Sequence, residues 1–144
     1  VVINRETWNA CGHLLDTGLV GADIAGRLEA AGQTSDAALA EAEQVRARFT
    51  AEVDAALERF SVLALPTMPN YPLRLEDAAD TRAVLGMTAF VRPFNLSGHP
   101  ALSIPCEGQA GLPVGLQLIA AKGADELLLA VAGELLRRLD SNLL

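Results

Sequence analysis

Ser97 and His99 are the residues whose types and spacing come nearest to hydrolytic chemistry in this sequence. Acyl transfer needs an activated nucleophile, a base within hydrogen-bond reach and donors for the oxyanion. A serine and a histidine two positions apart could form the first pair. However, the segment that holds them reads N-L-S-G-H-P, and Asn, Gly and Pro within six residues are typical of a turn. We therefore interpret both as polar turn residues and expect no catalytic residue in this chain.

The other reactive side chains also have structural explanations. Ser35 directly precedes an acidic, helix-like segment and is a natural N-cap. Lys122 precedes a glycine and is expected in a solvent-facing turn, and Cys106 follows a proline at a strand end, where packing is the better interpretation. With Cys11 as the only other cysteine and no ligand spacing around His13, neither a disulfide framework nor a metal site is indicated. We expect reduced thiols, no metal and no organic cofactor.

Composition excludes several functional classes. The net charge is −7 and there is one lysine, so a nucleic-acid partner is not expected, because phosphate binding needs clustered Lys and Arg. The richest apolar run, Leu127–Ala132, is far shorter than a membrane span. The first residues, V-V-I-N-R-E, lack the features of a signal peptide. The sequence therefore predicts a cytoplasmic protein without a membrane partner, and its 51% hydrophobic content predicts a packed core.

Hydrophobic periodicity and turn residues indicate an α/β fold. The expected elements are short helices within 6–31, a long amphipathic helix over 36–60, a strand over 62–65, a helix over 84–94, strands over 101–104 and 114–119, and a helix from Asp125. Glycine in the connection between the last two strands favours an antiparallel hairpin. All three strands are apolar on both faces, which suits the middle of a sheet. In the last helix, the inward residues should be Leu128, Val131, Leu135 and Leu139.

Several motifs follow one another between residues 65 and 134. They read L-P-T-M-P, N-L-S-G-H-P-A-L-S-I-P, L-P-V-G-L-Q-L and then a helix that opens with D-E. Their order and spacing resemble the C-terminal third of the amidase signature family, over about half of the chain. The resemblance implies the C-terminal portion of a layered amidase fold, with a mixed sheet flanked by helices and residues 1–144 forming a single unit.

The resemblance also implies an activity, the hydrolysis of carboxamide C–N bonds. The family's nucleophile, bridging serine and lysine lie in an N-terminal Gly/Ser-rich segment, and this sequence holds no such segment. The expected function is therefore that of a C-terminal fragment of an amidase acting on a small carboxamide or urea-type bond through an acyl-enzyme. The fragment would supply a pocket wall and part of the sheet. Its partners would be the missing N-terminal portion, or a second copy, and a small amide substrate.

The candidate substrate-binding residues come from the helix before the N-L-S-G motif. The resemblance implies that a residue seven positions before the motif's Asn reads the substrate. It is a carboxylate in some members, and in others this residue and the one four positions later are apolar contacts. That position is Thr88, and Arg92 lies one helical turn later, on the same face, with Leu85 beside them. Arg92 could bind a substrate carboxylate, or it could fold back onto Asp77 or Asp80.

Arg27 is a weaker candidate, because it falls near a family arginine that also recognises substrate. A competing hypothesis from another class is a non-catalytic structural or partner-binding module that docks to another chain.

Overall fold

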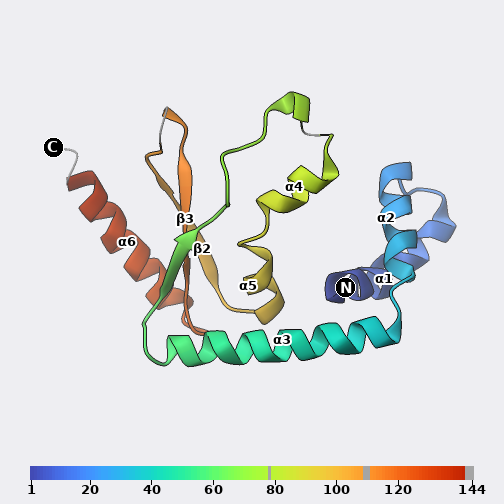
Figure 1. The fold of residues 1–144 in the computed structure, drawn as a ribbon, viewed down its shortest axis with the longest axis horizontal. Helices are drawn as coiled ribbons and strands as arrows, with labels where there is room; N and C mark the ends of the chain where they lie inside the picture. Colours follow the sequence, from blue (N-terminus) through green and yellow to red (C-terminus); the bar gives the residue numbers. More distant parts are fainter. Residues whose placement is uncertain (78, 109–110, 142–144) are drawn as a thin grey trace. The chain divides into compact units, whose positions relative to one another are not determined.

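The computed structural model describes residues 1–77, 79–108 and 111–141 and has the expected α/β class (Figure 1). The elements in chain order are α1 (Val2–Cys11), η1 (Gly12–Thr17), α2 (Ala22–Gly32), α3 (Asp36–Leu57), β1 (Leu63–Pro66), η2 (Leu75–Asp77), α4 (Thr81–Met87), α5 (Arg92–Ser97), β2 (Ala101–Cys106), β3 (Val114–Ile119) and α6 (Asp125–Ser141). They divide into two compact units, Val1–Phe49 and Thr50–Leu144. The single unit over residues 1–144 stays a prediction.

The first unit contains the short helices that the sequence predicts, packed around one aromatic ring. A Cβ atom added at Gly12 or at Gly32 would lie 2.9 Å from ring carbons of Trp8. Glycine at these two positions therefore lets η1 and α2 approach closely the ring that α1 carries. Arg5 ties α1 to the turn after α2, because its Nη2 donates to the Thr34 carbonyl oxygen at 2.6 Å.

The long helix α3 confirms the predicted element and its cap. The Ser35 hydroxyl oxygen accepts the Ala38 backbone N–H at 3.2 Å, as an N-cap does. The helix ends at Leu57, three residues before the predicted limit of 60. Of its residues, all of them described, only Val53 is buried, and Val45 on the apolar face is 45% exposed. The hydrophobic periodicity therefore predicted the helix correctly. It did not indicate how much of the apolar face of α3 would be buried.

The second unit is built on a three-stranded antiparallel sheet in the order β1-β3-β2. The predicted hairpin of β2 and β3 is confirmed, with Cys106 opposite Val114 and Ala101 opposite Ile119; residues 109–110 of its connection lie outside the described residues. Within the described residues β3 alone has a strand on each side. Along β1, half-buried and exposed residues alternate, so the described residues do not cover both faces of this strand.

Helix α6 covers one face of this sheet and forms the main core with it. Leu128 and Ala132 of α6 pack against Ile104 and Leu118 of the strands. Val131 and Leu135 pack against the same cluster, as predicted. The prediction for Leu139 is wrong, since it is 38% exposed, and Figure 1 shows why: α6 diverges from the sheet toward its C-terminal end.

The single helix predicted over 84–94 is two short helices, α4 and α5. Pro93 lies in the first turn of α5, where a residue without an N–H is tolerated, whereas it would break the interior of one continuous helix. Thr88 is the C-cap of α4. Helix α5 continues to Ser97 and ends at Gly98, whose φ of 75° favours glycine. The predicted turn over 95–100 is therefore confined to its last three residues.

Candidate functional site

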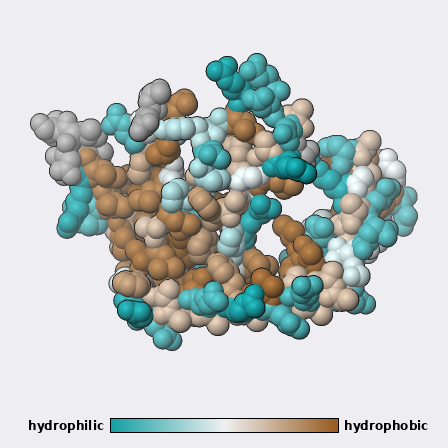
Figure 2. Space-filling model, viewed as in Figure 1, coloured by the Kyte–Doolittle hydropathy of each residue, from teal (hydrophilic) through white to brown (hydrophobic). Residues whose placement is uncertain are grey.

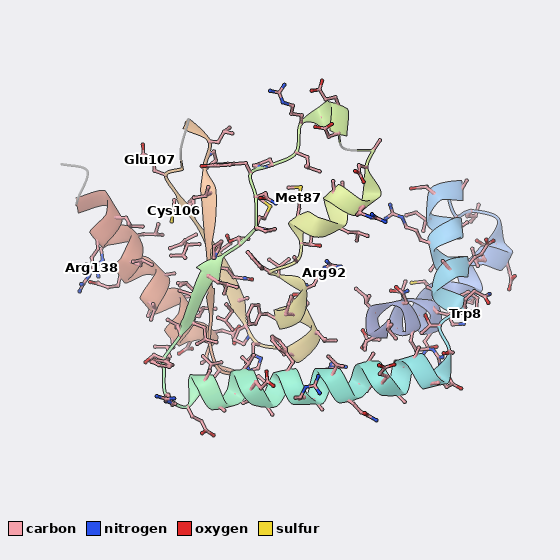
Figure 3. All side chains as sticks on the ribbon, in the orientation of Figure 1. Trp8, Met87, Arg92, Cys106, Glu107 and Arg138 are labelled. Atoms are coloured by element: carbon pink, nitrogen blue, oxygen red, sulfur yellow. The ribbon has the colours of Figure 1, made fainter. Side chains whose placement is uncertain are left out.

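The turn from α4 to α5 brings the three predicted pocket residues, Leu85, Thr88 and Arg92, together. The Thr88 hydroxyl donates to the Leu85 carbonyl oxygen at 3.0 Å. The Arg92 guanidinium donates from Nη2 to the same carbonyl at 2.9 Å, and from Nε to the Thr88 carbonyl at 3.4 Å. Figure 3 shows Arg92 at the start of α5, below α4. The i, i+4 pair therefore shares one surface, although the two residues do not belong to one helix.

Arg92 acts here on the C-terminal end of α4. The last carbonyls of a helix lack partners within the helix and carry partial negative charge, so a cation is favourable there. A guanidinium has five N–H donors, and these two contacts use two of them. Asp80, one of the two carboxylates considered as its partner, instead caps the start of α4 by accepting the backbone N–H groups of Arg82 and Ala83. Leu85, next to these contacts, is 51% exposed.

Arg27, the weaker candidate, lies on α2 in the first unit and is exposed. The candidates Leu85, Thr88 and Arg92 belong to the second unit. A substrate-binding role for any of the four residues stays a prediction.

Three of the sequence motifs meet at one point of the sheet. Thr67, from L-P-T-M-P, donates its backbone N–H to the Gly115 carbonyl oxygen at 2.8 Å. Its hydroxyl lies 2.5 Å from the Ser103 hydroxyl. A Cβ atom at Gly115 would lie 2.5 Å from Thr67 Oγ1 and 2.8 Å from Ser103 Oγ. The three motifs therefore depend on one another here. Residue 115 must be glycine, because the hydroxyl pair of Thr67 and Ser103 occupies the space that a side chain would need.

Ser97 and His99 do form a pair, but a buried one. His99 Nδ1 lies 2.8 Å from Ser97 Oγ, and His99 Nε2 lies 2.9 Å from Asp54 Oδ1 on α3. The His99 side chain has no exposed surface, and Ser97 is 5% exposed. A serine enclosed in this way is poorly placed to attack a substrate. His99 lies in the predicted turn, whereas Ser97 is the last residue of α5.

Gln117 is a third buried polar residue of the motifs, 3% exposed. It points to the face of the sheet opposite α6, and its side-chain Nε2 donates to the Phe90 carbonyl oxygen at 3.0 Å. This bond attaches the α4–α5 turn to the central strand. The candidate surface is therefore held by the sheet on one side and, through His99, by α3 on another.

A cavity of about 500 Å³ lies between the segment after β1 and the hairpin. Its walls are mainly apolar; they comprise Pro66, Met68, Pro69, Asn70, Tyr71, Pro72, Cys106, Pro113, Val114, Gly115 and Leu116. Cys106 also packs against the core cluster, which agrees with its predicted structural role. The cavity does not include Leu85, Thr88 or Arg92. The two features are therefore separate.

The described residues hold no cluster of three or more His, Cys, Asp or Glu side chains that could bind a metal ion. Lys122 is exposed beside Gly123, as expected for a turn residue. None of the helices that the structure describes is long and apolar enough to cross a membrane.

This arrangement of sheet, helices and motif contacts is that of part of an amidase-type fold. A family profile described as Amidase matches residues 18–129. The chain belongs to the amidase signature family, as the motifs predicted.

Related sequences agree with this assignment. A glutamyl-tRNA(Gln) amidotransferase subunit of Moorella thermoacetica is 41% identical over 98 residues, which is 67% of this chain and 20% of that protein. The corresponding protein of Archaeoglobus fulgidus is 40% identical over 78 residues, 54% of this chain and 17% of that protein. The chain thus spans about a fifth of the length of the curated relatives it matches.

Solved structures share the fold. A 6-aminohexanoate cyclic dimer hydrolase is 31% identical with a TM-score of 0.63, covering 79% of this chain and 27% of that one. The allophanate hydrolase of Kluyveromyces lactis is 25% identical with a TM-score of 0.76, covering 92% of this chain and 22% of that one. A structure described as an amidase is 25% identical with a TM-score of 0.80, covering 94% of this chain and 33% of that one.

The sequence did not identify two residues that hold the candidate surface, Asp54 and Gln117. Asp54 lies on the polar side of the periodic pattern of α3, which is typical of a solvated carboxylate. Gln117 carried a usable signal, since a lone amide within the apolar run V-G-L-Q-L-I is a buried polar group that needs a partner.

Proposed function

We propose that this chain is part of an amidase that hydrolyses a small carboxamide or urea-type C–N bond through an acyl-enzyme. The segment supplies one wall of the substrate pocket and part of the sheet, and the nucleophile comes from another portion of the parent protein. No metal or organic cofactor takes part, and the parent protein is cytoplasmic. Family membership and the resemblance to proteins named as hydrolases of 6-aminohexanoate cyclic dimer and of allophanate support this proposal.

The observation that carries the proposal is the α4–α5 turn, where Leu85, Thr88 and Arg92 share one exposed surface. Thr88 stands where some members of the family have a carboxylate, which argues against glutamine as the amide donor. Arg92 stands where others have an apolar contact, which argues against a long lipid tail. The N–H donors of its guanidinium that the two carbonyl contacts do not use could bind a substrate carboxylate. The preferred substrates would then be small amides that carry a negative group.

The test replaces Arg92 by leucine in the full-length enzyme. A charge-assisted hydrogen bond to a substrate carboxylate contributes about 1.5–3 kcal/mol. Arg92→Leu should therefore raise KM for acidic amides roughly 10- to 150-fold and change KM for neutral amides far less. Ammonia release from matched acidic and neutral amides measures both values.

Arg82→Leu is the matched control, because it removes an exposed arginine from α4 in the same unit. It should leave the ratio of the two KM values unchanged. If Arg92→Leu weakens both substrate classes equally, Arg92 has only its structural role at the end of α4.

We also propose that an apolar surface of the second unit docks against the missing N-terminal amidase portion or a second copy. Figure 2 shows apolar surface gathered over the sheet and α6. On the β2–β3 hairpin and α6, large apolar side chains that are at least 36% exposed include Leu112, Val114 and Leu127. Contiguous apolar surface of this kind usually marks an interface. The purified 144-residue chain should bind a hydrophobic dye and self-associate, and a clean monomer without dye binding would contradict the proposal.

The alternative is a structural or partner-binding module without any catalytic role. One observation supports this alternative. The described residues include candidate binding residues, but the possible nucleophile and base, Ser97 and His99, are buried. The reading frame upstream of Val1 separates the two functions. A Gly/Ser-rich segment preceded by a lysine supports the amidase, and its absence supports the module.

A further inference from the structure

We propose that His99 is a positioning residue, which fixes α5 against α3 and thereby sets the orientation of Arg92 for substrate selection. The selection step rests on the proposed function, whereas the positioning of α5 does not. The inference starts from the three hydrogen bonds that connect Asp54, His99, Ser97 and Phe94.

The chemistry of these groups assigns a direction to the hydrogen bond between His99 and Asp54. A carboxylate only accepts, so the Asp54 contact requires a proton on His99 Nε2. His99 Nδ1 lies 2.8 Å from Ser97 Oγ, and the single hydroxyl proton of Ser97 serves either this contact or the one to the Phe94 carbonyl oxygen. The contact from Ser97 Oγ to the Phe94 carbonyl is longer, at 3.3 Å. Asp54 therefore fixes a proton on Nε2 and holds the ring with Nδ1 toward Ser97.

Because the ring is buried, these hydrogen bonds restrict its position and do more than hold α5 and α3 together. The His99 side chain is fully enclosed, while the Asp54 side chain is 51% exposed. A buried imidazole without partners would cost free energy, so the ring keeps only the positions in which both nitrogens are bonded. An apolar residue at 99 could fill the same space, but it would not specify how α5 is rotated about the contact.

Ser97 and Arg92 are the two ends of the same short helix, α5. At the Ser97 end, the Gly98 N–H also donates to the Phe94 carbonyl, at 2.9 Å, and Phe94 itself is 8% exposed. At the other end, the guanidinium of Arg92 extends back to α4. Because six helical residues move as one piece, a rotation at Ser97 is transmitted to Arg92.

The experiment removes the carboxylate of Asp54, the exposed end of this series of hydrogen bonds, and leaves the buried residues in place. In the full-length protein, Asp54→Ala deletes the acceptor of His99 Nε2 at a half-exposed helix position, where alanine favours the helix. Glu52→Ala is the matched control, because it removes an exposed carboxylate two residues earlier on α3. Asp54→Asn keeps an oxygen that can accept the hydrogen bond without the charge and should restore the behaviour of the parent protein.

Two measurements are made on each variant. The first is hydrogen exchange of the Gly98 amide, together with the ¹⁵N resonances of the His99 ring. The second is the preference for acidic over neutral amides. Asp54→Ala should accelerate exchange at Gly98, abolish the single Nε2–H tautomer and reduce the preference roughly 2- to 30-fold. Glu52→Ala should change none of them.

The outcomes distinguish this inference from the proposed function. If Asp54→Ala lowers Tm but leaves Gly98 exchange, tautomer and substrate preference unchanged, His99 is structural and the inference is overturned. If the parent enzyme shows no preference for acidic amides, the role of Arg92 fails. The positioning of α5 is then judged by exchange and tautomer alone, and unchanged values refute it.

Discussion

The two faces of the sheet in the second unit are stabilised in different ways. On the α6 face, Ile104 and Leu118 pack against Leu128 and Ala132 without directional bonds. On the opposite face, Gln117 holds the α4–α5 turn by a hydrogen bond to the Phe90 carbonyl. Apolar burial supplies free energy but tolerates small shifts, whereas a buried hydrogen bond depends steeply on distance and angle.

This difference assigns different tasks to the two faces. The α6 face supplies most of the stability of the unit, and the opposite face places a polar candidate surface with defined geometry. Substitutions on the first face should therefore alter the free energy of unfolding most. Substitutions on the second should alter the arrangement of α4 and α5 at a smaller cost in stability.

The largest effect is expected from Leu128→Ala on the α6 face. Leu128 is 3% exposed within the core cluster, and large-to-small changes at such positions cost about 2–5 kcal/mol. Its neighbour Leu129 is 61% exposed, so Leu129→Ala is the matched control and should stay within about 0.5 kcal/mol. Urea unfolding of the purified protein measures both. Equal losses in the free energy of unfolding would contradict the expectation that the α6 core supplies most of the stability.

An intermediate effect is expected from Gly115→Ala, where the motifs meet. The new Cβ atom would collide with the hydroxyls of Thr67 and Ser103, and overpacking of this kind costs about 1–3 kcal/mol. Adding Ser103→Ala should recover part of the loss, since it removes one of the two close oxygens.

The control for that substitution is Gly133→Ala in α6, where nothing lies within 4 Å of the new Cβ. Alanine in the interior of a helix should there stabilise the protein by about 0.5–1 kcal/mol. Thermal unfolding that shows the same sign at both glycines would contradict the role assigned to the Thr67–Ser103 pair.

The smallest effect is expected at Glu134, on the exposed side of α6. The hydrogen bond from Arg138, with the charge of Arg137 next, lowers the pKa of this carboxyl below its ordinary value of 4.5. A lowered folded-state pKa contributes stability that is present above pH 4.5 and lost as pH falls through the folded value. Because the Glu134 side chain is 43% exposed, solvent and salt screen the contribution. Wild type and Glu134→Gln should therefore differ slightly in urea midpoint at neutral pH and low salt, and converge in acid.

The sequence predicted the elements with a clear period or a clear stop. Helix α3, the hairpin of β2 and β3, and the start of α6 at Asp125 are where periodicity, turn residues and acidic first-turn residues placed them. It failed over 84–94, where Pro93 divides one expected helix into two. The prediction was also wrong at Leu139, because the hydrophobic period of a helix can continue beyond the surface against which the helix packs.

Local sequence thus determined the fold class, the family and the grouping of Leu85, Thr88 and Arg92, because these depend on spacing along the chain. Only the tertiary structure decided that Asp54 would bind His99, 45 residues away, and that Thr67 would lie against Ser103 and Gly115. Such contacts depend on how strands and helices are registered in space. The sequence around a polar residue on an exposed helix face does not indicate that this residue will bond to a buried ring elsewhere in the chain.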